Sequence, residues 1–220
     1  MGILELAAVK VLSSAAVLLF STVLLMATAK RISTCDYLIA CQSAILTAEV
    51  AAVGYVQHLP AAYVIAGVVL LAKVFCIPYA LLWLMKKLRT SHDVGASLSP
   101  GYSVFVMSGL MVLSFAVVRL YLQELHATEV ILAAAVALIL SGAFLMVTRS
   151  KALMLMMGLL VLENGIFLAA LVTIFGMPLI IEIGIVFDLL IGLFLMGIFV
   201  FRIRDTFDHL DVSRLRGLRG

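Results

Sequence analysis

Long apolar runs, separated by short polar segments, divide the chain into seven stretches. Each stretch is about 20 residues long, the length that a helix needs to cross the hydrocarbon core of a bilayer. Strands that cross a membrane would instead alternate polar and apolar residues over roughly ten positions, a pattern that these runs do not follow. The runs predict seven transmembrane helices, at roughly 8–29, 36–56, 61–85, 102–121, 129–148, 152–175 and 178–202.

The basic residues fall in every second break between the runs. Twelve of the 15 lysines and arginines follow the first, third, fifth and seventh runs. The intervening breaks contain no lysine or arginine but hold His58, Glu124 and His126, and Glu129 stands at the start of the fifth run. Because positively charged loops of membrane proteins face the cytoplasm, this alternation predicts an outside N-terminus and a cytoplasmic C-terminus. The same alternation requires an odd number of spans.

The overall composition agrees with this interpretation. The chain is 65% hydrophobic and 12% charged, whereas soluble domains are about half apolar and a quarter charged. We therefore expect an all-α integral membrane protein whose apolar surface meets the lipid bilayer, with no nucleic-acid partner. Cys35, Cys41 and Cys76 form no CxxC or Cys/His set, so we expect no metal or cofactor in this chain. Because residues 1–5 lack a basic segment, the first run is expected to be a span rather than a signal peptide.

Ionisable residues inside the apolar runs are the candidate functional groups. Glu49, Lys73, Glu163 and Asp188 lie near the middles of the second, third, sixth and seventh runs, and Glu182 lies closer to an end of the seventh. A charge at the bilayer centre costs about 2.5–3.5 kcal/mol even on lenient scales, so such residues usually face a bundle interior or a wet cavity. Burial also favours the neutral form of an ionisable group. A row of such groups at one depth predicts a proton relay.

The second and third runs leave two interpretations open. Gln42 lies seven residues before Glu49, on nearly the same face of a helix. Pro78 follows Lys73 and removes a backbone hydrogen bond, which frees the carbonyl of Val74 to bind water or a side chain. These features suit a relay, but Glu49 and Lys73 could equally form a fixed structural ion pair.

The last three runs carry a recognisable pattern. It consists of Leu162-Glu163-Asn164-Gly165, the segment 187–193 with sequence FDLLIGL, and the segment 209–217 with sequence HLDVSRLRG. This pattern resembles the small three-helix K-type (4L-type) subunit of respiratory complex I. In that family an acid in the middle helix and another in the third helix contribute to proton translocation. Glu163 and Asp188 match those positions, with Asp where the family usually has Glu.

The resemblance divides the chain into three parts. Residues 127–203 are similar to the K-type subunit, residues 1–126 add a four-helix membrane extension, and residues 204–220 form a basic cytoplasmic tail. The whole chain resembles the membrane component E of hydrogenase-4 and formate hydrogenlyase complexes. This implies a non-catalytic membrane-arm subunit of a hydrogenase-4-like or complex I-like respiratory oxidoreductase complex in the cytoplasmic membrane of a bacterium or archaeon.

The resemblance also implies partners. Antiporter-like and quinone-site-like membrane subunits would adjoin the chain, and a peripheral hydrogenase or dehydrogenase module would carry the nickel–iron centre and iron–sulfur clusters. Two alternatives stay open. One is a small subunit of a multicomponent cation/proton antiporter, whose C-type chain also resembles the K-type subunit, although the four added helices argue against it. The other is a purely structural membrane linker.

Overall fold

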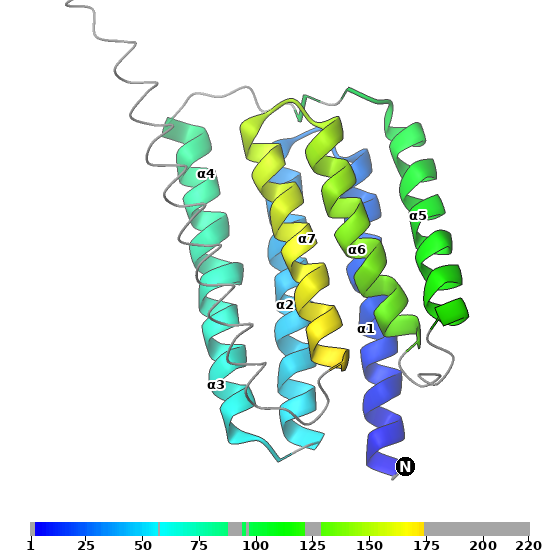
Figure 1. Ribbon diagram of the computed structural model, residues 1–220. Helices are drawn as coiled ribbons and strands as arrows, with labels where there is room; N and C mark the ends of the chain where they lie inside the picture. The colour runs from blue at the N-terminus through cyan, green and yellow to red at the C-terminus, as the bar shows by residue number, and fades with distance from the viewer. Residues whose placement is uncertain (1–2, 57, 88–93, 96, 122–128, 174–220) are drawn as a thin grey trace, which may run out of the picture. The chain divides into compact units, whose positions relative to one another are not determined.

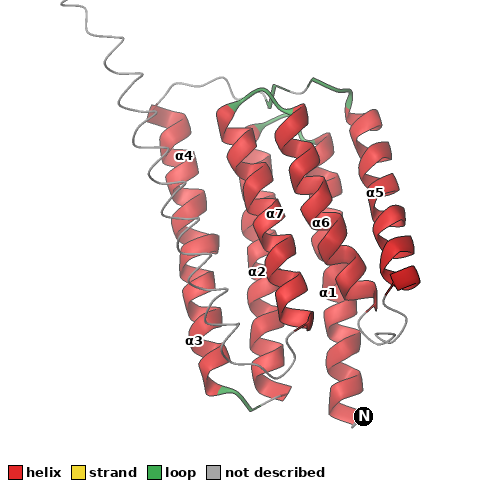
Figure 2. Cartoon of the chain, in the orientation of Figure 1, coloured by secondary structure: helices red, strands yellow, loops and turns green. Residues whose placement is uncertain are grey.

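A computed structural model describes residues 3–56, 58–87, 94–95, 97–121 and 129–173. The chain divides into two compact units, Met1–Gly184 and Ile185–Gly220, and all described residues belong to the first. That described part is almost entirely helical (Figure 2). Its elements in chain order are α1 (Ile3–Thr28), α2 (Ile32–Val56), α3 (Pro60–Val69), the π-helix η1 (Leu70–Cys76), α4 (Ile77–Lys87), α5 (Pro100–Tyr121), α6 (Glu129–Thr148) and α7 (Ala152–Thr173).

The helices follow the first six predicted runs, with ends that differ by a few residues. The segments α3, η1 and α4 continue one another and together form the third predicted helix. Within the described residues, five helices are long and apolar enough to cross a membrane: 32–56, 60–83, 100–121, 129–148 and 153–171. Helix α1 contributes a shorter apolar helix, Leu12–Thr28. The predicted seventh span, 178–202, lies outside the described residues.

Helix α2 occupies a central place in this unit. It lies against α1 on one side and against α3, η1, α4 and α7 on others, while α1 also contacts α5 and α6 (Figure 1). Among the described elements, α6 and α7 have the most extensive contact of any two. A side chain on α2 can therefore meet partners from several helices that lie far apart in the sequence.

The close contact between α6 and α7 depends on glycines. A Cβ atom on Gly142 would lie 2.5 Å from the backbone nitrogen of Leu162 and 2.7 Å from the carbonyl oxygen of Gly158. A Cβ atom on Gly165 would lie 2.8 Å from the backbone nitrogen of Ile139. Any larger residue would push the two backbones apart. Small residues at such positions are the usual means by which membrane helices approach closely.

The connections that follow α1, α4 and α6 meet at one end of the helices, which we call the basic end. The backbone N–H of Val94 donates to the carbonyl of Lys30 at 3.3 Å, and that of Ser97 donates to the carbonyl of Thr148 at 3.1 Å. These bonds join three connections that are remote in sequence. They bring together the first three basic breaks, as the alternation of charge along the chain requires.

Two further contacts fasten the basic end. Ser150 donates to the carbonyl of Gly95 from its backbone N–H at 3.2 Å and from its hydroxyl at 3.0 Å. Arg149, which is buried, donates from Nη2 to the carbonyl of Ala27 at 3.1 Å. Ala27 lies in the last turn of α1, where carbonyls lack helical donors and a positive charge is favourable. Arg149 thus holds the end of α1 against the α6–α7 connection.

Candidate functional site

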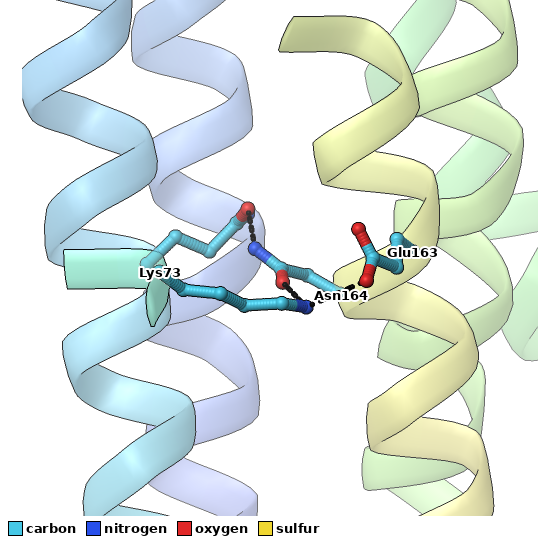
Figure 3. Close-up of polar contacts among 4 residues, drawn as sticks. Lys73, Glu163 and Asn164 are labelled. Atoms are coloured by element: carbon cyan, nitrogen blue, oxygen red, sulfur yellow. Dashed lines mark hydrogen bonds and ion pairs between the residues drawn. The ribbon is translucent and has the colours of Figure 1, made fainter. Parts of the chain in front are cut away.

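Lys73 and Glu163 form a buried ion pair in the middle of the described helices. The Lys73 ammonium lies 3.2 Å from Oε1 of Glu163, and the two side chains are 5% and 2% exposed. Lys73 comes from η1 and Glu163 from α7, and Figure 3 shows the lysine reaching across to α7. Two residues that the sequence placed deep in the membrane are therefore brought into contact.

Asn164 extends this contact from α7 towards α2. The Lys73 ammonium donates to Oδ1 of Asn164 at 3.1 Å, and Nδ2 of Asn164 donates to Oε1 of Gln42 at 2.8 Å (Figure 3). Nε2 of Gln42 then donates to the Thr22 hydroxyl of α1 at 3.1 Å. We call Thr22, Gln42, Lys73, Glu163 and Asn164 the central network.

The lysine sets the direction of every hydrogen bond in the central network. An ammonium group only donates, so the carboxamide oxygen of Asn164 must face Lys73 and its NH₂ group must face Gln42. Gln42 then presents its own oxygen to Asn164 and its NH₂ group to α1, where the Leu19 carbonyl also accepts at 3.3 Å. The amide side chains are satisfied in one orientation, which fixes the position of the ammonium.

An aromatic ring gives the ammonium a further favourable contact. Phe167 lies one helical turn after Glu163 on α7, and its ring centroid is 5.9 Å from the Lys73 nitrogen. A cation at this distance from a ring is attracted by the negative face of the π system. Lys73 therefore has an anion, an amide oxygen and an aromatic ring around it.

The π-helix η1 explains how Lys73 turns inward. The hydrogen bonding of a π-helix continues at Ile77, whose backbone N–H donates to the carbonyl of Ala72, five residues earlier. Pro78 follows at once and has no N–H to give, which agrees with the predicted break in helical hydrogen bonding. Within η1 only Lys73 is buried. Short π-helical segments occur often at functional sites.

Glu49 lies apart from the central network. Its side chain is 2% exposed, and neither carboxylate oxygen has a hydrogen-bond partner among the described residues. Gln42 belongs to the network, and Glu49 lies seven residues farther along α2, a rise of about 10 Å. The ion pair of Lys73 is with Glu163, so the alternative of a fixed Glu49–Lys73 pair is wrong. Lys73 and Glu163 share one depth, as predicted, while Glu49 lies at another.

Asp36 and Ser43 are buried polar residues that the sequence did not single out. Asp36 is fully buried and Ser43 is 1% exposed, and in the described part of the chain neither carboxylate oxygen of Asp36 nor the Ser43 hydroxyl has a partner. Asp36 stood at the very start of the predicted span 36–56, where a charge needs no explanation. The spacing of Asp36, Ser43 and Thr47 on one helical face was the available signal.

Two predicted relay residues, Asp188 and Glu182, lie outside the described residues, as does the tail 204–220. The three cysteines are free; Cys35 is buried, whereas Cys41 and Cys76 are exposed. Across the described ranges, no group of three or more His, Cys, Asp or Glu side chains could hold a metal ion.

Comparison with known proteins identifies a relative. The chain is 34% identical over 118 residues to an uncharacterized protein of Mycobacterium tuberculosis, Rv0085. The match covers 53% of this chain and 54% of that protein, so the chain spans about half the length of the curated relative it matches. No family model matches the chain, and no solved structure matches it.

Proposed function

We propose that the chain is a membrane-arm subunit of a hydrogenase-4-like or complex I-like respiratory oxidoreductase complex and contributes to proton translocation through its buried carboxylates. The observation that carries the proposal is the Lys73–Glu163 pair, 3.2 Å apart and buried midway along apolar helices. The resemblance of the segments around Glu163 and Asp188 to the K-type subunit supports the same function.

The surroundings of the Lys73–Glu163 pair suit a change in the protonation state of Glu163. Taking two charges out of water costs several kcal/mol per ion, and their attraction offsets this only with good geometry and additional hydrogen bonds. Asn164 and Phe167 supply such contacts to the lysine. A proton that arrives on Glu163 removes the negative charge while the ammonium keeps its other two contacts. Charges on neighbouring subunits can therefore shift the equilibrium between the ionised and the protonated form of Glu163.

The amide side chains of the central network have a different role. Asn164 and Gln42 neither gain nor lose protons at neutral pH, because carboxamides are not titratable groups. They hold Lys73 and Glu163 in register through bonds of 3.1 and 2.8 Å. The protons themselves are carried by Glu163 and by the further acids Glu49, Asp188 and Glu182, with water between them.

The proposed setting of the chain follows from the same resemblance. Its partners are antiporter-like and quinone-site-like membrane subunits and a peripheral hydrogenase or dehydrogenase module, which holds the nickel–iron centre and iron–sulfur clusters. The chain itself does no redox chemistry. Its location is the cytoplasmic membrane of a bacterium or archaeon, and the bacterial relative agrees with the first of these.

Purification of the tagged chain in mild detergent, followed by proton-pumping measurements in reconstituted vesicles, tests the proposal. We expect the redox module to copurify, and we expect Glu163→Gln to preserve assembly and electron transfer but lower the number of protons pumped per electron. Glu129→Gln makes the same chemical change in the first turn of α6 and serves as the control. Copurification with antiporter subunits alone, or unchanged pumping in Glu163→Gln, contradicts the proposal.

A further inference from the structure

Helix α2 carries buried polar atoms at three heights. Asp36, Ser43 and Glu49 are all buried, and within the ranges that the structure describes their carboxylate and hydroxyl oxygens have no protein partner. Buried polar groups in native proteins nearly always bond to protein or to ordered water, since an unsatisfied one is costly. Ordered water inside the helix bundle would satisfy these oxygens.

The three positions follow the axis of α2 from the basic end inward. Asp36 lies in the second turn of α2, which begins at Ile32 next to the basic end. Ser43 adjoins Gln42 and so lies at the height of the central network. A seven-residue step is nearly two full turns, so Asp36 and Ser43 lie on almost the same face and about 10 Å apart along the axis.

Ile39 and Ala40 lie between Asp36 and Ser43 along α2. Ile39 is 1% exposed and fills its side of this stretch, whereas Ala40 lies one turn from Asp36 and contributes only a methyl group. A water path would run on the Ala40 side. Thr47 lies one turn beyond Ser43, and its hydroxyl donates to the Ser43 carbonyl at 2.8 Å. The Thr47 hydroxyl satisfies a backbone carbonyl, whereas the buried Ser43 hydroxyl has no partner among the described residues.

The other face of α2 carries Gln42 and Glu49, seven residues apart. Gln42 is bonded to α1 and α7, so this face looks towards those helices. Glu49 continues it by about 10 Å towards the end remote from the basic connections. One helix thus presents a buried acid on either side of the central network.

We propose that Asp36 and Ser43 line a water-filled route along α2 that carries protons between the basic end and the Lys73–Glu163 pair, and that Glu49 continues the route on the far side. This inference rests on the proposed function. It adds, to a row of acids at one depth in the membrane, a proton path that runs along the axis of α2. In each step a water-borne proton bonds to a carboxylate oxygen of Asp36, and the same carboxyl later releases a proton to the next water. No oxidant or reductant takes part.

The first test compares variants of Asp36 in the intact complex. We expect Asp36→Asn to lower the rate of proton pumping in vesicles by at least about tenfold, because a positioned proton-transfer group contributes about 10²–10⁴-fold to a rate. Asp36→Glu keeps a carboxyl and should restore most of the pumping. Thr34→Val changes an exposed polar residue on the neighbouring turn and should pump like the wild type.

The second test leaves Asp36 intact and uses heavy water as the probe. In a chain whose Cys35, Cys41 and Cys76 are replaced by alanine, Ser43→Cys is compared with Leu46→Cys by infrared spectroscopy of the S–H stretch. Both positions are buried to the same degree. We expect the thiol at position 43 to exchange to S–D on transfer into D₂O, and the thiol at position 46 to exchange far more slowly.

The outcomes separate this inference from the proposed function. Wild-type vesicles that do not pump contradict the proposed function, and the thiol exchange still tests the wet face. If Glu163→Gln stops pumping while assembled Asp36→Asn pumps normally, the axial route is wrong and the relay at Glu163 stands. If Asp36→Asn does not assemble, equally slow exchange at positions 43 and 46 overturns the route, and fast exchange at position 43 alone supports it.

Discussion

Helix α7 has two contact faces that differ in kind. Towards α6 it presents Gly158 and Gly165, and the two backbones approach so closely that no Cβ atom fits. Towards η1 and α2 it presents Glu163, Asn164 and Phe167, which hold the Lys73 ammonium. The first face is closely packed backbone against backbone, and the second carries two ionisable groups. A rigid contact on one side of a helix gives the polar groups on its other side fixed positions.

The largest effect is expected where one charge of the polar face is removed. Lys73→Met leaves the Glu163 carboxylate buried without its ammonium, a change that costs about 3–5 kcal/mol. The double variant Lys73→Met with Glu163→Gln should recover most of this loss, because both charges are gone. Thermal unfolding of the detergent-solubilised complex measures both. A single variant that is as stable as the double would show that the pair is solvated.

Added side-chain volume at the contact between α6 and α7 should destabilise the chain. Gly142→Val places side-chain atoms against the backbone of Leu162 and Gly158, and overpacking of this kind costs up to about 3 kcal/mol. We expect a lower amount of the chain in membranes and a lower unfolding temperature. Gly109→Val on α5 is the matched control, since a Cβ atom there meets nothing within 4 Å. Equal effects of the two substitutions would contradict the close contact of α6 and α7.

A smaller effect is expected for the amide that joins the polar face to α2. Gln42→Leu keeps the approximate volume but removes the acceptor of Asn164 Nδ2, at a cost of about 1–2 kcal/mol. Because Asn164 orients Lys73, we expect the protons pumped per electron to fall clearly while the unfolding temperature falls only slightly. Gln42→Glu keeps an acceptor at the same place and should retain more pumping than Gln42→Leu. The ratio of pumping to electron transfer in vesicles gives this comparison.

The smallest effect is expected at the aromatic contact. Phe167→Leu retains apolar volume but loses the cation–π attraction to Lys73, which is worth about 1 kcal/mol. Assembly should be unaffected, and the unfolding temperature should fall slightly. Phe167→Tyr keeps a ring and should match the wild type. A loss in Phe167→Leu as large as that in Lys73→Met would mean that Phe167 supports the fold rather than the ammonium.

The sequence by itself determined the helices and the depth of their charges. Run length and composition are local properties that report how much chain can lie in lipid. They predicted the six helical runs of the described part, with α3, η1 and α4 as one run, and placed Lys73 and Glu163 near the middles of two of them. The spacing of basic breaks likewise anticipated that the first three of them lie at one end. The seventh span and Asp188 fall outside the described residues, so these remain predictions.

Only the tertiary structure decided which charges meet. The pairing of Lys73 with Glu163 rather than Glu49 depends on how each helix is rotated about its axis, and on the wider turn of η1 before Pro78. The burial of Asp36 depends on α2 beginning at Ile32, a turn earlier than the apolar run suggested. Hydropathy shows that a segment is apolar, but it does not show which face of the helix packs against a neighbouring helix. That choice is made by close contacts such as those of Gly142, which involve residues far apart in the chain.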